Sequence, residues 1–225
     1  MTDTIVRFSG IGKTYDGSTC VVDDLDLDIE RGEFLTLLGP SGSGKTTTLM
    51  MLAGFETPTS GEILLDGKPL AHLPPYKRQI GMVFQSYALF PHMTVAENIA
   101  FPLSVRNIAR AETTGRVERA LEMVQLGGFG GRRPAQLSGG QQQRVAVARA
   151  LGGKPSILLA DEPTGNLDSK NGEAVMELLG GLHREGATIC MVTHDPRFAR
   201  YADRSINLFD GRVVEENTKE EATVA

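Results

Sequence analysis

Short apolar runs alternate along this chain with segments that have helical periodicity. The runs predict strands, and the run at 25–29 alternates apolar with acidic residues, which is typical of an antiparallel sheet with one face in solvent. At 117–124, apolar residues recur with the i, i+3, i+4, i+7 spacing of an amphipathic helix. Thr94 and Glu97 form a capping box that predicts the start of another helix. The predicted strands are 4–8, 25–29, 34–38, 61–66, 80–84, 157–160, 188–192, 204–208 and 212–214.

This order of elements predicts one α/β domain with an insertion. We expect residues 1–85 and 156–214 to form the core with an antiparallel β subdomain, and residues 86–155 to form a helical subdomain. The acidic tail at 215–225 is predicted to be disordered. The 225 residues, 40% hydrophobic and 23% charged, suit a single domain of this class.

Charge and hydropathy exclude several classes of partner and location. The net charge is −5 and no block of Lys or Arg occurs, so we expect no nucleic-acid partner. There is no secretory leader and no apolar stretch of membrane-spanning length. The two cysteines, Cys20 and Cys190, lack the spacing of metal ligands. We therefore expect the chain in the cytosol, or at a membrane surface through a partner.

The strongest chemical signal is the segment 35–47, L-T-L-L-G-P-S-G-S-G-K-T-T. An apolar strand leads into a loop with three glycines and then into a helix, which is the context of the phosphate loop G-x-x-x-x-G-K-T. The glycines let backbone N–H groups point at one anion, and the helix adds its positive N-terminus. Lys45 is expected to contact the β- and γ-phosphates, and the Thr46 hydroxyl to ligate Mg²⁺. The sequence therefore predicts a site for a nucleoside triphosphate.

Polar residues at the ends of other predicted strands extend this prediction. Asp161 and Glu162 close the apolar run at 157–160, and two adjacent carboxylates there require a cationic partner. Asp161 is predicted to bind Mg²⁺, and Glu162 to act as the base for the attacking water. Gln85 and His194 each follow a predicted strand, where ligands bind in open α/β sheets. For His194 we expect a contact with the γ-phosphate.

Two weaker signals depend on this triphosphate site. The segment 137–141, L-S-G-G-Q, opens a predicted helix with Ser138 as N-cap and Gln141 three residues later. This helix N-terminus could bind an anion, but the same pattern also fits an ordinary capped helix. Tyr15 lies in the turn-rich segment G-K-T-Y-D-G, from which it could stack on a purine base.

Together these motifs resemble one family, the ATP-binding cassette ATPases that drive membrane transporters. The resemblance covers nearly the whole chain, and its most specific element is the signature segment, L-S-G-G-Q at 137–141. It implies an α/β fold with a P-loop NTPase (RecA-like) core, an antiparallel β subdomain and an inserted α-helical signature subdomain. It also implies ATP and Mg²⁺ as cofactors and hydrolysis of ATP to ADP and phosphate.

The resemblance implies a role for each matched residue. Tyr15 resembles the aromatic residue that stacks on adenine, and Asp168 resembles the D-loop aspartate. Gln85 resembles the glutamine that contacts Mg²⁺ or water and reports to the transporter. The residues implied in nucleotide binding are Tyr15, Gly39, Ser41, Gly42, Gly44, Lys45, Thr46, Thr47, Ser138, Gly140, Gln141 and Asp168. The implied catalytic residues are Lys45, Gln85, Glu162 (of the Walker B pair) and His194 (the switch histidine), and the implied metal ligands are Thr46, Gln85 and Asp161.

The resemblance also implies partners. Members of the family work as head-to-tail homodimers that form with ATP, and Ser138 would then bind the γ-phosphate of the nucleotide held by the other subunit. A membrane permease is the second implied partner, with the chain peripheral on the cytoplasmic side of the bacterial inner membrane. The alternative function is a soluble ATPase of this family that is not coupled to transport.

Two stretches resemble different subfamilies. The phosphate loop, the segment 77–103 and the segment 132–146 resemble ATPases of polyamine, iron and sugar importers. The segment from Leu159 onward, L-A-D-E-P-T-G-N-L-D-S, resembles the macrolide-exporter and lipoprotein-release group. This division leaves the direction of transport open and indicates a mosaic chain, either natural or engineered.

A stretch rich in apolar residues predicts where the permease binds. The surface from 86 to 103 carries more apolar side chains than a solvent-facing loop needs. The alternative is that these side chains pack the core of the helical subdomain. They are Tyr87, Leu89, Phe90, Met93 and Phe101.

Overall fold

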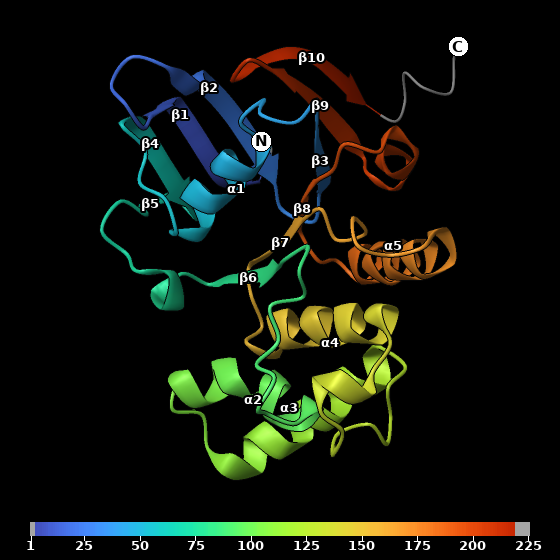
Figure 1. The fold of residues 1–225 in the computed structure, drawn as a ribbon. Coiled ribbons are helices and arrows are strands. Elements are labelled where there is room, and N and C mark those ends of the chain that lie inside the picture. The colour runs from blue at the N-terminus through green and yellow to red at the C-terminus, as the bar shows by residue number, and fades with distance from the viewer. Residues whose placement is uncertain (1–2, 219–225) are drawn as a thin grey trace. The chain divides into compact units, whose positions relative to one another are not determined.

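The computed structural model describes residues 3–218, which fall into two compact units. The first unit comprises Met1–Arg78 and Leu182–Ala225, and the second comprises Gln79–Gly181. Figure 1 traces the elements of both units, and each unit is described by itself.

An antiparallel sheet of four strands, in the order β2-β1-β4-β5, belongs to the first unit. Its strands are β1 (Thr4–Thr14), β2 (Cys20–Glu30), β4 (Ser60–Leu65) and β5 (Lys68–Pro69). In β2 the apolar Leu25, Leu27 and Ile29 are buried, while Asp24 and Asp26 are exposed. The alternation in the sequence therefore gave the correct face of the sheet. Strands β1 and β2 are longer than their apolar runs, because their pairing continues as far as the Thr14 and Cys20 pair.

A second set of strands in this unit is mostly parallel, in the order β10-β9-β3-β8. Strands β3 (Phe34–Leu38) and β8 (Ile189–Val192) are almost wholly buried, as continuous apolar runs in parallel sheets usually are. Helix α1 (Lys45–Ala53) follows β3 and packs against β2 and β8. Strand β9 (Arg204–Phe209) pairs with β3 in parallel.

Strand β10 (Arg212–Thr218) corrects one prediction, because it includes four residues of the tail predicted to be disordered. Its polar side chains are held across the β9–β10 pair. Glu216 accepts from Arg204 Nη1 at 2.7 Å, and Glu215 accepts from Asn207 at 2.9 Å. Cross-strand pairs of this kind stabilise an exposed strand that composition alone assigns to a tail. Residues 219–225 lie outside the described residues.

The second unit contains two parallel strands and a helical part. The strands are β6 (Ile80–Val83) and β7 (Ile157–Asp161), and the helices are α2 (Val95–Val105), α3 (Arg110–Met123) and α4 (Gly139–Gly152). Helix α5 (Ser169–Arg184) begins in this unit and ends in the first. Short 3₁₀ helices occur at Pro75–Lys77, Pro134–Gln136 and Pro196–Tyr201. No helix among residues 3–218 has the length and apolar character needed to cross a membrane.

Helices α2, α3 and α4 pack on one another around a core of their own. The predicted helical stripe of α3 faces this core, which confirms its periodicity. The capping box of Thr94 is also present: its hydroxyl accepts from the Glu97 amide at 3.2 Å, and the Glu97 carboxylate accepts from the Thr94 amide at 2.7 Å. The core residues are Val95, Ile99, Val117, Ala120, Leu121, Val124, Leu126, Leu137, Val145 and Ala148.

Arg78 is a buried cation of the first unit that binds carbonyls at the end of α1. Its guanidinium donates to the carbonyls of Met51, Leu52, Leu70 and Leu73 at 2.7–2.9 Å. The first two belong to the last turn of α1, whose carbonyls have no partner within the helix. Burial lowers the pKa of Arg78 from its ordinary value. Gly54, with φ 88°, leaves room for the guanidinium, since a Cβ there would lie 2.6 Å from it.

Replacing Arg78 by Met should lower the free energy of unfolding by roughly 2–4 kcal/mol, because buried carbonyls would lose their donors. Urea denaturation followed by circular dichroism measures this change. Arg7→Met is the control, since Arg7 makes an exposed ion pair with Asp28 whose loss should matter little. If the two variants unfolded at the same urea concentration, Arg78 would not be a structural anchor.

Candidate functional site

The phosphate loop, residues 39–46, is shaped by close backbone contacts within the first unit. Gly39 (φ 145°), Gly42 (φ 83°) and Gly44 (φ 92°) all have positive φ. A Cβ on Gly39 would lie 2.1 Å from the Leu208 carbonyl oxygen, and one on Gly44 would lie 2.5 Å from the Val21 carbonyl oxygen. At these two positions only glycine satisfies both the backbone angle and the available space.

Lys45 closes this loop on itself. The side chain is almost fully buried, at 5% exposure, and its ammonium donates to the carbonyls of Gly39 (2.8 Å) and Pro40 (2.7 Å) and to Ser43 Oγ (3.3 Å). An ammonium has three donors, and three oxygens of the loop surround it. The positive charge is thus held within the phosphate loop itself.

The N-terminus of α1 suits an anion for a second reason. Its N-cap is Gly44, which supplies no side chain, and its first turn contains no acidic residue. The positive end of the helix dipole is therefore not offset by an acidic residue in that turn. Thr46 and Thr47 lie in this first turn, with Thr46 exposed and Thr47 half-buried.

Tyr15 and His194, the other predicted residues of the first unit, are both exposed. Tyr15 lies between β1 and β2 with 60% of its surface accessible, and the Lys13 ammonium lies 4.7 Å from its ring centre. His194 lies two residues after the end of β8 (Ile189–Val192). The next residue, Asp195, caps the 3₁₀ helix and pairs with Arg197 at 2.7 Å, and this pairing lowers the pKa of Asp195.

In the second unit, the two predicted carboxylates stand where β7 ends. Asp161 is the last residue of the strand, and Glu162 turns the chain with a left-handed φ of 46°. Such a conformation is strained for a residue with a long side chain, and strain of this kind is concentrated at functional sites. Both side chains are half-buried.

The structure brings Gln85 next to the turn that follows Glu162. A Cβ on Gly165 would lie 2.5 Å from Gln85 Nε2, and Asn166 Nδ2 donates to the Gln85 carbonyl at 3.1 Å. Gln143, on α4, donates to the Pro163 carbonyl at 2.6 Å and lies 3.4 Å from the Phe84 carbonyl. Gln143 of α4 thus contacts both the residue before Gln85 and the residue after Glu162.

The signature segment lies against the start of α5. Asp168 accepts hydrogen bonds from the amide (3.0 Å) and side chain (2.6 Å) of Asn171, which lower the pKa of Asp168. A Cβ on Gly140 would lie 2.4 Å from Asn171 Oδ1, so only glycine allows this close approach. Ser138 accepts from the Gln141 amide at 3.3 Å, and Gln141 accepts from the Ser138 amide at 2.9 Å. The helix is thus capped in the ordinary way, and anion binding there stays a prediction.

Three polar residues of this unit were missed by reasoning from the sequence. Asn98 is fully buried on α2 and bonds the Phe90 amide (2.8 Å) and carbonyl (3.1 Å). Gln143 and Arg149 lie on α4 and bond backbone carbonyls. The available signal was the occurrence of polar residues among apolar ones on the predicted helices.

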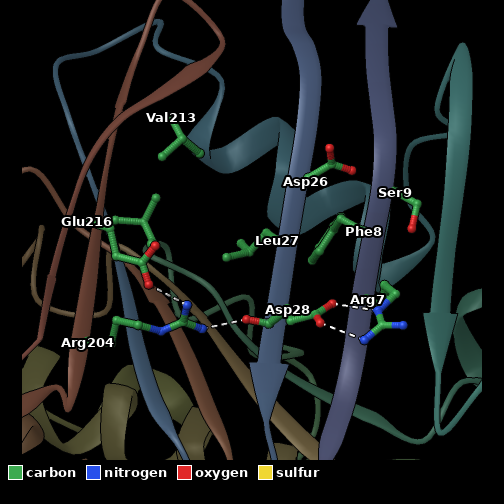
Figure 2. A pocket seen from close by; sticks show the side chains of 10 residues that line it. Arg7, Phe8, Ser9, Asp26, Leu27, Asp28, Arg204, Val213 and Glu216 are labelled. Carbon is green, nitrogen blue, oxygen red and sulfur yellow. Dashed lines mark hydrogen bonds and ion pairs between the residues drawn. The ribbon is translucent and has the colours of Figure 1, made fainter. Parts of the chain in front are cut away.

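A cavity of about 410 Å³ lies elsewhere in the first unit and is not part of this site. Figure 2 shows that both arginines of its lining are engaged by neighbouring groups. Arg204 bonds Glu216 at 2.7 Å and the Asp28 carbonyl, and Arg7 bonds both oxygens of Asp28. The lining residues are Arg7, Phe8, Ser9, Asp26, Leu27, Asp28, Arg204, Ile206, Val213 and Glu216.

The predicted site residues are therefore divided between the units. The first unit holds Tyr15, the phosphate loop with Thr47, and His194. The second holds Gln85, the signature residues, Asp161, Glu162 and Asp168. A strand, a glycine loop closed by a lysine and a helix without a side-chain cap define the class of P-loop nucleotide-binding proteins.

Comparison with known proteins identifies the family. A family model described as ABC transporter matches residues 22–165. The spermidine/putrescine import ATP-binding protein PotA of Escherichia coli K12 is 51% identical over 219 residues, which are 96% of this chain and 58% of that protein. PotA of Oleidesulfovibrio alaskensis is 49% identical over 94% of this chain and 57% of its own length. The chain thus spans a little over half the length of these curated relatives.

Solved structures agree with this assignment. The dimeric structure of MJ0796, a bacterial ABC transporter cassette, has a TM-score of 0.85 and 40% identity and covers 95% of this chain and 98% of its own. CbiO1 from Clostridium perfringens, part of the ABC transporter complex cbiONQ, has a TM-score of 0.89 and 31% identity, with coverage of 99% and 91%. The chain belongs to the ABC transporter family and has the fold of an ATP-binding cassette. The predicted P-loop NTPase fold is confirmed.

Lys45→Ala should weaken ATP binding by about 10- to 150-fold, because a charge-assisted contact with phosphate is lost. Titration of the purified chain with a fluorescent ATP analogue measures the dissociation constant. Lys68→Ala is the control, since Lys68 is an exposed residue of β5. Equal affinities in the two variants would contradict the role of Lys45.

Proposed function

We propose that this chain is the ATP-hydrolysing subunit of an ABC importer and that it couples hydrolysis to substrate movement by a membrane permease. The observation that carries the proposal is the phosphate loop, closed around the buried Lys45 ammonium. Keeping a charged ammonium in this almost fully buried position costs solvation free energy, and an anionic phosphate bound at the loop would offset that cost. The charge serves an anionic ligand.

The donors proposed for Mg²⁺ are all oxygens. They are the Thr46 hydroxyl, the Gln85 amide oxygen and the Asp161 carboxylate, and hard oxygen donors suit this ion. When bound, Mg²⁺ supplies positive charge at the β- and γ-phosphates. Lys45 and the amides of the phosphate loop orient the same phosphates.

Glu162 accepts a proton from the attacking water in this proposal. Its left-handed backbone turns the chain directly after Asp161. We assign the two adjacent carboxylates different tasks. Asp161 holds the metal and Glu162 holds the water. Gln85 helps to orient that water, and His194 contacts the γ-phosphate.

The proposed assembly is a head-to-tail homodimer. One solved relative is described as the dimeric, post-hydrolysis state of the cassette MJ0796 with ADP and Pi, at 40% identity and a TM-score of 0.84. Ser138, Gly140 and Gln141 would face the nucleotide held by the other subunit. Ser138 is exposed, so its hydroxyl is accessible to a partner although it caps its own helix.

We assign the direction as import. The curated relatives named as spermidine/putrescine import proteins match 94–96% of this chain, including the segment from Leu159 that resembles exporters. A polyamine is therefore the first substrate class to test. The permease places the chain on the cytoplasmic side of the inner membrane. No observation favours the alternative of a soluble ATPase without transport.

We propose that the permease binds at the paired rings of Phe90 and Phe101. The ring centres are 4.6 Å apart, and Phe101 is 37% exposed. Leu89 packs on the helical core, and the Tyr87 hydroxyl bonds the Asn166 carbonyl at 3.3 Å. Tyr87 and Leu89 thus have internal roles, and we take the Phe90–Phe101 pair as the centre of the docking surface.

Glu162→Gln tests the proposed reaction. It removes the base and keeps the size of the side chain, so the ATPase rate should fall by about 10²–10⁴-fold while ATP binding is retained. Phosphate release and the fluorescent ATP titration measure the two quantities. Turnover close to that of the unmodified chain would show that Glu162 is not the base.

Mixing Ser138→Arg with Lys45→Ala subunits tests the composite site. Each variant alone should be inactive, because every site in its homodimer has one defect. A mixed dimer has one site with both defects and one with neither. Each mixed dimer should therefore regain up to about half of the activity of an unmodified dimer if the sites act independently. Complete inactivity of the mixture would mean strict coupling, or a signature segment that serves its own subunit.

A further inference from the structure

The loop 84–90, which carries Gln85 and leads to the proposed docking pair, has an unusual backbone. Tyr87 (φ 63°) and Ala88 (φ 49°) are consecutive, and both have left-handed angles without being glycine. The Ala88 amide donates to the Ser86 carbonyl at 2.7 Å, two residues back, which is the bond of a tight γ-turn. With positive φ at its centre, such a turn is rare and strained. Something outside the loop must hold it.

Arg149, in the last turn of α4, makes the contacts that do this. Its Nη1 donates to the Ala88 carbonyl at 2.5 Å and its Nη2 to the Tyr87 carbonyl at 3.0 Å. The two carbonyls that it binds belong to the two left-handed residues. Burial lowers the pKa of Arg149, so the guanidinium is placed there despite the loss of solvation.

The two ends of the loop are held by residues of α4 and α2. Gln143, on α4, lies 3.4 Å from the Phe84 carbonyl, at the beginning of the loop. Asn98, on α2, bonds the amide and carbonyl of Phe90 at its end. Between these points, Arg149 makes the bonds to the strained part.

We propose that Arg149 is a positioning residue that fixes the loop 84–90 to the helix that begins at the signature segment. The inference rests on the proposed function in one respect, namely that Gln85 and the docking pair take part in hydrolysis and coupling. Movement of the docking pair would then reach α4 through the carbonyls of Tyr87 and Ala88, and movement of α4 would reach Gln85.

The shape of the guanidinium explains why the residue is an arginine. Its fixed fork presents two N–H donors to two neighbouring carbonyls, whereas a lysine ammonium is a flexible point charge. Arg149→Lys should therefore keep the charge and lose part of the restraint. Arg149→Met should lose both.

Hydrogen exchange of the peptide 84–90 tests the restraint without any reference to activity. In Arg149→Met, exchange in this peptide should rise about tenfold, because the left-handed pair is no longer held. Arg149→Lys should give an intermediate rise, and it is the variant to interpret if Arg149→Met fails to fold. Arg106→Met is the matched control, since Arg106 donates to the Gly153 carbonyl at 2.9 Å in the same unit. Unchanged exchange in both Arg149 variants would overturn the proposal.

Kinetics with Mg-ATP test the consequence for Gln85. Arg149→Met should lower kcat by about 10- to 100-fold and leave KM for ATP within about twofold, because the phosphate loop is untouched. Ala88→Gly should restore part of kcat in the double variant, since glycine adopts left-handed angles without strain. An equal loss of kcat in Arg149→Met with and without Ala88→Gly would mean that Arg149 is only a packing residue.

The two measurements separate the two proposals. Altered exchange in a chain that hydrolyses no ATP would support the restraint and contradict the proposed function. Normal hydrolysis with unaltered exchange in the Arg149 variants would support the proposed function and contradict the restraint.

Discussion

The close approach of two backbone carbonyls to the phosphate loop is the constraint on which the first unit depends. The Leu208 carbonyl of β9 and the Val21 carbonyl of β2 leave no space for a side chain on Gly39 or Gly44. The glycines allow the loop to pass close to these carbonyls. In this conformation the Gly39 and Pro40 carbonyls accept from the Lys45 ammonium. The Gly211 amide also lies 3.3 Å from the Ser43 carbonyl, so the β9–β10 turn supports the same loop. Segments from both ends of the unit's sequence therefore shape one anion site.

Helix α4 has the corresponding position in the second unit. Its first turn is capped by Ser138, its middle contributes Gln143 to the carbonyls of Phe84 and Pro163, and its last turn contributes Arg149. These polar contacts lie on a helix whose other face belongs to the helical core. One rigid element thus carries the signature segment and holds the loop of Gln85. A helix is well suited to this task, because its residues keep fixed distances from one another.

The second unit combines local backbone strain with side-chain contacts that hold the strained segments. Glu162, Tyr87 and Ala88 are all left-handed without being glycine, and they lie in the segments to which function is assigned. Their conformations persist because neighbouring groups bind the carbonyls around them. Arg78 of the first unit likewise binds several backbone carbonyls, those of Met51, Leu52, Leu70 and Leu73.

The sequence by itself determined the fold class, the phosphate loop and the family, because these depend on local signals. The glycines and Lys45 follow a fixed spacing after an apolar strand, and the periods of α3 and β2 reveal their buried faces. The apolar strands were found, although β1 and β2 run further than their apolar residues, since backbone pairing does not require apolar side chains.

Only the tertiary structure decided the functions of polar groups that act on distant backbone. The last four residues of β10 were assigned to a disordered tail, because their acidic side chains find their partners on β9 and not locally. Asn98 and Arg149 bind carbonyls or amides of a loop, and a backbone group carries no mark in the sequence. The need for glycine at position 140 likewise comes from Asn171, a residue far away along the chain. Such contacts are set by how elements pack, and the local sequence does not contain that information.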